Sequence, residues 1–149
     1  MKEFDHDVET KLGAFGANMQ DKLVALAYEA REHSYCIYSN YAVGACLLTK
    51  SGKLYQGCNL ENAAFTPTVC AERVTFFKAL YDGEREFAAI AVVSTGEAPG
   101  FPCGVCRQVM AEFCGEDFIV ISGDREHNVI VTTLGELLPY SFGPKDLLK

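Results

Sequence analysis

The stretch from Phe87 to Met110, FAAIAVVSTGEAPGFPCGVCRQVM, decides the fold. Residues 87–94 are almost continuously apolar, which is typical of a strand that is buried on both of its faces. A loop containing Gly96 and Pro99 follows, and from Cys103 onward apolar residues recur at helical spacing. A buried strand that leads through a loop into a helix is the beginning of a βαβ unit, so the stretch predicts an α/β protein.

The segments on either side supply further strands and helices. We expect helices over 21–36 and 71–81, in addition to the helix that begins at Cys103. The other strands are predicted as two pairs, each joined by a connection so short that its strands are antiparallel. These strands are Val43–Thr49, Leu54–Asn59, Phe118–Ser122 and Val129–Thr133. The order α, β, β, α, β, α, β, β predicts a three-layer α-β-α sandwich with a five-stranded mixed sheet.

The composition is that of a single domain. The chain has 149 residues, of which 49% are hydrophobic and 22% charged, so it can bury one core. Residues 1–18 are more polar and contain Gly13 and Gly16, so we interpret them as an amino-terminal extension that is frayed or forms a weak helical turn. The domain is therefore expected to comprise residues 19–149.

The charge of the chain argues against a nucleic-acid polymer or a membrane as its partner. There are 13 Lys and Arg residues against 20 Asp and Glu residues, and the arginines are scattered, so no basic surface is predicted. No apolar run approaches the roughly 20 residues of a membrane span. The first ten residues are acidic where a signal peptide would have a basic head and an apolar centre. We expect a soluble cytoplasmic protein.

Three of the seven cysteines stand where helices are predicted to begin. Seven cysteines in 149 residues are too few for the disulfide scaffold of a small secreted protein, which favours thiols that bind metal, catalyse or fill the core. Cys70 precedes the helix over 71–81, and Cys103 and Cys106 begin the next helix. The positive end of a helix dipole lowers the pKa of a thiol, and three such thiolates could bind one zinc ion.

An open zinc site with three protein ligands is the simplest interpretation of these cysteines. A structural zinc has four protein ligands, whereas a catalytic zinc keeps its fourth position for water. No histidine lies in either motif, and Cys114 falls about three helical turns beyond Cys103. The pattern therefore predicts a catalytic site with a metal-bound hydroxide. The cysteine pair by itself also occurs in redox enzymes and in structural zinc sites.

Two charged residues on the first turn of the helix over 71–81 could assist this metal. Glu72 could lie beside the metal without binding it, which is the position of a proton shuttle. Arg73, together with the two helix termini, could offset the negative charge of three thiolates and a hydroxide. Each residue also has an ordinary interpretation, Glu72 as a solvated first-turn glutamate and Arg73 as one member of a surface ion pair.

The motifs Cys70-Ala71-Glu72 and Pro102-Cys103-Gly104-Val105-Cys106 match the H-x-E and P-C-x-x-C signature of zinc deaminases in its three-cysteine form. Through them the chain resembles the cytidine deaminases, small zinc-dependent enzymes of pyrimidine salvage. The resemblance is to the single-domain homotetrameric form and runs from about Tyr38 to Leu147. It implies a deaminase domain that binds one Zn²⁺ ion per subunit through Cys70, Cys103 and Cys106.

One further segment of the resemblance implies contacts with a sugar. Residues 57–63, GCNLENA, look like the ribose-binding segment of the family, in which the residues matching Asn59 and Glu61 form hydrogen bonds with sugar hydroxyls. Ala71, between the first zinc ligand and Glu72, is included among the substrate contacts. The alternative is that Asn59 and Glu61 only cap a turn after their strand.

Two aromatic residues are implied to close the site. In residues 38–45, YSNYAVGA, Tyr41 stands where the family usually has a phenylalanine that packs near the pyrimidine, so its hydroxyl is a departure. In residues 137–142, LLPYSF, Phe142 matches a phenylalanine that a neighbouring subunit inserts into the site. The resemblance therefore implies a homotetramer whose active sites are shared between subunits. Aromatic residues at such places are otherwise core or interface residues.

The implied reaction converts cytidine and deoxycytidine to uridine and deoxyuridine plus ammonia. Zinc-bound hydroxide attacks ring carbon 4, while Glu72 protonates ring nitrogen 3 and then carries the hydroxide proton to the departing amine.

The main alternative is a related deaminase for another aminopyrimidine nucleoside such as blasticidin S, although Asn59 and Glu61 favour an ordinary ribose. A deaminase for tRNA or single-stranded DNA conflicts with the acidic charge. A zinc-stabilised binding domain without activity is the remaining alternative.

Other cysteines and phenylalanines are expected to fill the core. The cysteines so assigned are Cys36, Cys46, Cys58 and Cys114. The phenylalanines so assigned are Phe65, Phe76, Phe77, Phe101 and Phe113.

Overall fold

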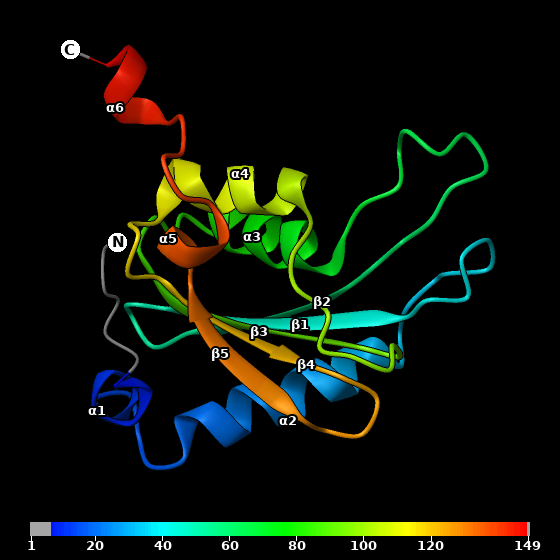
Figure 1. Cartoon of the computed structure of the whole chain (residues 1–149), viewed down its shortest axis with the longest axis horizontal. Coiled ribbons are helices and arrows are strands. Elements are labelled where there is room, and N and C mark those ends of the chain that lie inside the picture. The colour runs from blue at the N-terminus through cyan, green and yellow to red at the C-terminus, as the bar shows by residue number, and fades with distance from the viewer. Residues whose placement is uncertain (1–6, 149) are drawn as a thin grey trace.

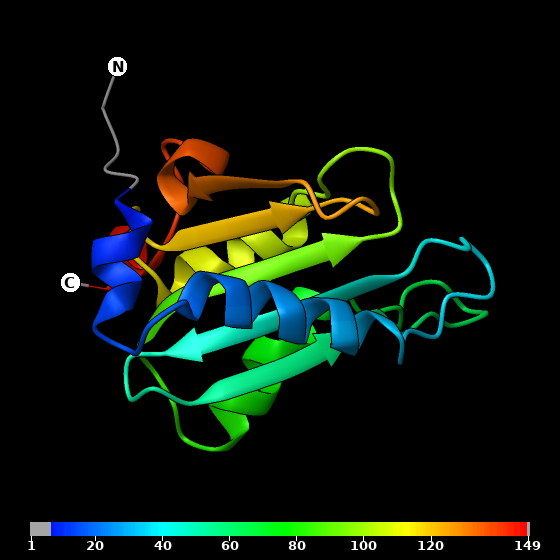
Figure 2. The same ribbon diagram turned by 90° about the horizontal axis from the view of Figure 1, so that it is seen from below.

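The computed structural model describes residues 7–148, and its centre is a five-stranded sheet (Figures 1 and 2). The strands are β1 (Val43–Thr49), β2 (Leu54–Cys58), β3 (Phe87–Ser94), β4 (Ile119–Gly123) and β5 (Val129–Thr133). Their order in the sheet is β2-β1-β3-β4-β5. All neighbours are antiparallel except β3 and β4, which are parallel. The predicted mixed sheet is therefore confirmed.

Helices cover both faces of this sheet and complete the three layers (Figure 1). On one face lie the two helices that follow β2 and β3, and on the other lie the two amino-terminal helices, as the view from below shows (Figure 2). Two short helices end the chain. The bounds are α1 Val8–Gly13, α2 Met19–Arg31, α3 Ala71–Tyr81, α4 Gly104–Phe113, α5 Leu134–Leu137 and α6 Pro144–Leu147.

Each face of the sheet has its own hydrophobic core, and β3 contributes to both. Ile90 points into the core beneath α3 and α4, where Phe76 is fully buried. Ala89 and Ala91 point into the opposite core, beneath α1 and α2. This double burial explains the continuous apolar run of β3. At Gly44 in β1, a Cβ atom would overlap the backbone of α2, so glycine allows the close approach of this helix.

The amino-terminal third of the chain differs from the sequence prediction. The helix predicted over 21–36 is α2, which ends at Arg31, because the backbone of Tyr35 then donates a hydrogen bond to the carbonyl of Asn59 instead of continuing the helix. Part of the predicted extension forms α1, whose Val8 and Leu12 are buried in the core beneath α2. Residues 1–6 of that extension lie outside the described residues.

The residues predicted to fill the core range from buried to exposed. Phe76 is fully buried and Phe113 packs against it, as expected, and Cys46 is fully buried. Cys36, Cys58 and Cys114 are partly buried. The core assignment is wrong for three phenylalanines that are exposed because they lie on an outer helix face or in loops: Phe65, Phe77 and Phe101.

Within residues 7–148, no helix is both long and apolar enough to cross a membrane.

Candidate metal centre and active site

Three cysteine sulfurs meet where α3 and α4 begin. Because β2 and β3 both run antiparallel to β1, their carboxyl ends lie at the same edge of the sheet, and each leads through a loop into its helix. Cys70 and Cys103 are the N-cap residues of α3 and α4, and Cys106 lies in the first turn of α4. Neither N-cap thiol forms a capping hydrogen bond with its helix, so both sulfurs are available for another partner.

The spacing of the sulfurs fits a tetrahedral metal ion. The Sγ atoms of Cys70 and Cys103 are 3.8 Å apart, and all three sulfurs lie within 4.8 Å of one another. Two ligands of a tetrahedral zinc with Zn–S bonds of about 2.3 Å are separated by about 3.8 Å. In the described part of the chain, these cysteines are the one cluster of His, Cys, Asp or Glu that could hold a metal ion.

The electrostatics around the sulfurs favour a thiolate. A hydrogen bond from Cys106 and one from Arg73 outweigh the effect of burial and hold the pKa of the Cys70 thiol at about 5. The same hydrogen bond to Cys70, together with burial, raises the pKa of Cys106. Arg73 Nη2 lies 3.5 Å from Cys70 Sγ, so the guanidinium stands against the sulfur cluster as the sequence suggested. A metal ion that binds Cys70 and Cys106 would displace the thiol proton of the hydrogen bond between them, because cysteine binds metals as the thiolate.

Glu72 has the burial expected of a proton carrier. Only 4% of its surface is exposed, so the solvated interpretation is wrong. Burial, and then the negative charge of Cys70, raises the pKa of the Glu72 carboxyl to about 7. A carboxyl with a pKa near neutrality can both accept and release a proton at physiological pH.

A cavity of about 440 Å³ opens beside these groups. Its walls include Cys70, Cys103 and Glu72, so the sulfurs and the carboxyl face one common space. Four residues proposed from the sequence as substrate contacts also line it, namely Tyr41, Asn59, Glu61 and Ala71. The arrangement therefore combines a metal site, a group that can carry protons and polar side chains at the rim.

A sequence model of the cytidine and deoxycytidylate deaminase zinc-binding region matches residues 17–122. The chain belongs to this deaminase family. The cytidine deaminase of Sporosarcina psychrophila is 48% identical to it over 85% of this chain and 93% of that protein. The resemblance found in the sequence is confirmed, and the three-sulfur cluster could hold the zinc ion of this region.

Solved structures of cytidine deaminases also match this deaminase chain. The crystal structure of the enzyme from Burkholderia pseudomallei has a TM-score of 0.79 and 47% identity, and the match covers 82% of this chain and 98% of that one. The cytidine deaminase from Mycobacterium tuberculosis has a TM-score of 0.73 and 35% identity, over 83% and 97% of the two chains. These matches confirm the predicted fold class.

Asn59 and Glu61 line the cavity of this deaminase but also organise its wall. Glu61 Oε1 accepts hydrogen bonds from the backbone N–H groups of Tyr38 and Ser39, at 2.9 and 3.1 Å. Hydrogen bonds from Ser39 hold the pKa of the Glu61 carboxyl below its ordinary value. Asn59 Nδ2 donates to the carbonyl of Tyr41 at 2.8 Å. The structure thus supports the turn-stabilising role of Asn59 and Glu61. Because both residues also line the cavity, they could contact a ligand as well.

The Tyr41 side chain has neighbours that its sequence context does not indicate. A Cβ atom placed on Gly96 would lie 3.2 Å from Cε2 and from the hydroxyl oxygen of Tyr41. A Cβ atom placed on Gly100 would lie 3.0 Å from the same hydroxyl oxygen. Ser94 Oγ is as close to both glycines. Glycine at these positions therefore gives Tyr41 the space to lie against the loop that leads to the cysteine pair.

Several cavity residues were not identified from the sequence. Phe101, assigned to the core, is part of the cavity wall, and its position next to Pro102-Cys103 was an available signal. The remaining ones are Ser39, Val43, Thr68, Val69, Val92, Ser94 and Gly100. These residues come together at the cavity through contacts between distant segments, which local patterns do not encode.

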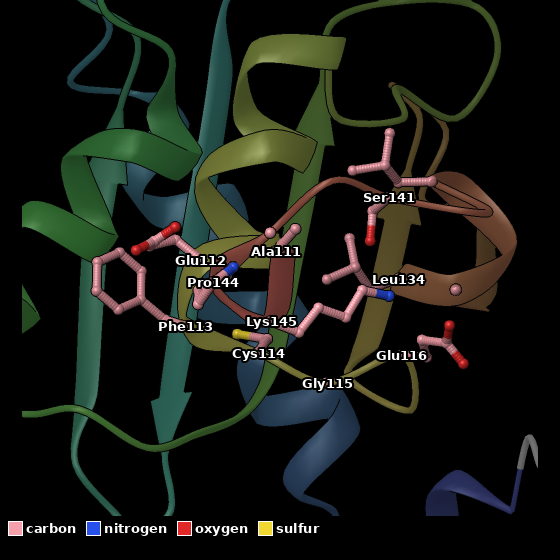
Figure 3. Close-up of a pocket in the computed structure, with 13 residues that line it drawn as sticks. Ala111, Glu112, Phe113, Cys114, Gly115, Glu116, Leu134, Ser141, Pro144 and Lys145 are labelled. Carbon is pink, nitrogen blue, oxygen red and sulfur yellow. The ribbon is translucent and has the colours of Figure 1, made fainter. Parts of the chain in front are cut away.

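Phe142 does not lie in the cavity of its own chain. Its carbonyl accepts a hydrogen bond from Gln108 Nε2, and 58% of the residue is exposed. The adjoining segment lines a different cavity of about 480 Å³, which has no lining residue in common with the first (Figure 3). This second cavity contains neither the three sulfurs nor Glu72.

Proposed function

We propose that this protein catalyses the hydrolytic deamination of cytidine and deoxycytidine to uridine and deoxyuridine, with release of ammonia. The observation that carries the proposal is Glu72, buried beside three clustered thiols and facing a cavity that Asn59 and Glu61 also line. The cytidine deaminase of Sporosarcina psychrophila, 48% identical over most of both chains, supports this reaction.

Cys70, Cys103 and Cys106 would hold the zinc ion as thiolates. Three protein ligands leave one position of a tetrahedral site open. When bound there, zinc supplies Lewis acidity that makes water a nucleophile at neutral pH. Arg73 limits the negative charge that accumulates on the sulfurs, because its guanidinium donates a hydrogen bond to Cys70.

Glu72 would move the protons that the reaction requires. Replacing the amine at ring carbon 4 by oxygen means that ring nitrogen 3 must be protonated and that ammonia must leave with an added proton. With its pKa raised to about 7, the Glu72 carboxylate can take one proton of the attacking water and give it to nitrogen 3, then take the second proton and deliver it to the amine. The carboxyl thus ends the cycle ionised, as it began.

The cavity chemistry favours a nucleoside over a nucleotide. Asn59 and Glu61 would hold the 3′-hydroxyl of the sugar, which both cytidine and deoxycytidine carry. Among the described residues, no lysine or arginine lines the cavity, and Glu61 and Glu72 are acidic, so a phosphate group would find no countercharge. The substrate class is therefore an uncharged pyrimidine nucleoside, and the role is in pyrimidine salvage.

The catalytic unit proposed here is residues 19–149, working in a homotetramer with shared active sites. Support for a covering subunit comes from two exposed aromatic side chains at the rim, Tyr38 and Phe65, whose rings lie 6.1 Å apart. They line a surface hollow that adjoins the cavity through Ser39, Glu61 and Thr68. A site made of three thiols remains reduced in the cytoplasm, where we place the protein.

The first test follows the ultraviolet absorbance of cytidine after addition of purified protein, with and without a zinc chelator. We expect the aminopyrimidine band to decay only without chelator and to decay again after zinc is returned. Full activity in a protein shown to be zinc-free would contradict the metal assignment. A zinc-loaded protein that leaves cytidine, deoxycytidine and blasticidin S unchanged would instead indicate a binding domain.

A further inference from the structure

The Asn59 side chain forms three hydrogen bonds with the rest of the protein. Its Oδ1 accepts from the backbone N–H of Val43, at 2.9 Å, and from the hydroxyl of Ser34. Its Nδ2 donates to the carbonyl of Tyr41. An asparagine amide has two acceptor lone pairs and two donor hydrogens. Both lone pairs are therefore used, and within the described chain one N–H hydrogen is left for the cavity.

The two backbone partners fix which way the amide faces. Val43 N–H can only donate and the carbonyl of Tyr41 can only accept, so a flipped amide would lose both bonds. With the amide in this orientation, the Ser34 hydroxyl must act as donor toward Oδ1. Of the three partners of the Asn59 amide, only Ser34 bonds through its side chain. Its hydroxyl hydrogen occupies the second lone pair of Asn59 Oδ1.

Ser34 is itself anchored by the backbone around it. Its N–H donates to the carbonyl of Arg31 at 3.1 Å, at the end of α2. The next residue, Tyr35, donates to the carbonyl of Asn59 at 3.0 Å and accepts from the N–H of Glu61 at 2.8 Å. The segment after α2 therefore runs beside both sugar-contact candidates, and the Ser34 hydroxyl lies against Asn59, whose backbone carbonyl is 3.4 Å from it.

This arrangement makes Asn59 a donor and Glu61 an acceptor toward the cavity. The amide presents only N–H, because its oxygen is saturated, while Glu61 Oε1 receives two backbone bonds and Oε2 remains as an acceptor. A single hydroxyl group both accepts and donates, so it can satisfy this pair at once. An ether oxygen or a methylene group could not.

We infer that Ser34 is a positioning residue for sugar recognition, which acts by occupying the second lone pair of Asn59 Oδ1, so that the amide is held by a third bond and presents only N–H toward the 3′-hydroxyl of the nucleoside. The inference rests on the proposed function and adds a residue outside the cavity wall to it. Ser34 does not line the cavity, and removal of its hydroxyl leaves one lone pair of Oδ1 unpaired and the amide held by two hydrogen bonds instead of three.

The test compares Ser34→Ala with the unaltered zinc-loaded protein on two substrates. For cytidine we expect KM to rise about fivefold, the effect of one hydrogen bond of average strength, with kcat within about twofold. For 2′,3′-dideoxycytidine, which lacks the 3′-hydroxyl, KM, or the inhibition constant if turnover is slow, should be the same in both proteins. Ser34→Thr, which keeps a hydroxyl, should restore the KM for cytidine.

Ser51→Ala is the matched control, because the Ser51 hydroxyl also forms hydrogen bonds but lies in the turn after β1, where it contacts Glu84 at 3.1 Å. It should change neither constant. An unchanged KM in Ser34→Ala, or a rise that is equal for cytidine and dideoxycytidine, overturns the inference while the unaltered protein still deaminates cytidine. An unaltered protein with no activity on cytidine contradicts the proposed function itself.

Discussion

Arg73 Nη2 donates a hydrogen bond to Cys70 Sγ at 3.5 Å, across the first turn of α3. Three thiolates on one zinc ion would donate so much negative charge that the metal would lose power to acidify water. A guanidinium hydrogen-bonded to one of the sulfurs withdraws part of that charge. Under the proposed function, Arg73 would therefore tune the reactivity of the metal without binding it.

Replacement of Arg73 by glutamine should lower kcat for cytidine by about tenfold to a hundredfold, the usual effect of losing a partner of a metal ligand. Steady-state rates measured with the zinc content of each preparation test this. Arg125→Gln is the control, because Arg125 forms only a surface pair with Glu97 at 3.2 Å and should leave kcat unchanged. A fully zinc-loaded Arg73→Gln protein with normal kcat would rule out the tuning role.

Replacement of Glu72 by glutamine should reduce kcat by at least about a hundredfold, because the amide cannot exchange protons with the substrate. Zinc should remain bound, since Glu72 is not one of the three clustered ligands. Metal analysis and the rate at saturating cytidine are measured on the same sample. Glu112→Gln changes an exposed glutamate on α4 and should have no effect. Activity within a factor of ten of the unaltered protein would refute the proton-carrier role.

The sequence predicts best those features that local patterns encode. The continuous apolar run predicts β3, and a helical composition followed by Gly83 predicts α3, and the bounds of both agree with the structure. The end of α2 at Arg31 could not be predicted, because it depends on hydrogen bonds that the Tyr35 backbone donates to Asn59 and accepts from Glu61, both distant in sequence. The short helix α5 was overlooked although Thr133 and Glu136 form a capping box that is visible in the sequence.

The same division applies to the candidate site. The cysteine spacing and Glu72 come from short motifs at predicted helix starts, so their meeting could be anticipated. Ser34 and Phe101 reach the site from loops whose paths depend on the whole fold. Tyr41 was predicted near the substrate, but its close approach to Gly96 and Gly100 required the three-dimensional arrangement.

Phe76 and its neighbour Phe77 provide a matched pair for testing the core. Phe76 is fully buried, with its ring 4.9 Å from that of Phe87, whereas Phe77 is 50% exposed. Phe76→Ala should lower the free energy of unfolding by about 3–5 kcal/mol through lost burial and the cavity that remains. Phe77→Ala should lower it by less than about 1 kcal/mol. Denaturant titrations at one protein concentration measure both, and equal losses would contradict the assigned packing.

Stability at low pH should depend on Asp124 in the turn between β4 and β5. Hydrogen bonds with Asn128, and one with the N–H of Glu126, lower the pKa of the Asp124 carboxyl in the folded protein. The folded state thus favours the ionised form. Its stabilising effect is complete above the ordinary pKa of about 3.9 and disappears as the pH falls through the lowered value.

Asp124→Asn should therefore show a smaller loss of thermal stability between neutral pH and pH about 3 than the unaltered protein. Melting temperatures measured across this range give the comparison. Asp117→Asn, at an exposed residue near the start of β4, should follow the unaltered protein. If Asp124→Asn and the unaltered protein lose the same stability on acidification, the turn does not contribute to the pH dependence.

Phe142 can contribute to the reaction only from another subunit, because it lies outside the cavity of its own chain and 58% of it is exposed. In a homotetramer with shared sites, dilution should reduce activity per subunit in parallel with dissociation followed by sedimentation. Phe142→Ala should raise KM for cytidine by about tenfold, while Tyr140→Ala, at a fully exposed neighbour, should not. Because an isolated subunit would leave the rim of the cavity open, full activity in a strictly monomeric preparation would exclude shared sites and remove the reason for assigning Phe142 to the substrate.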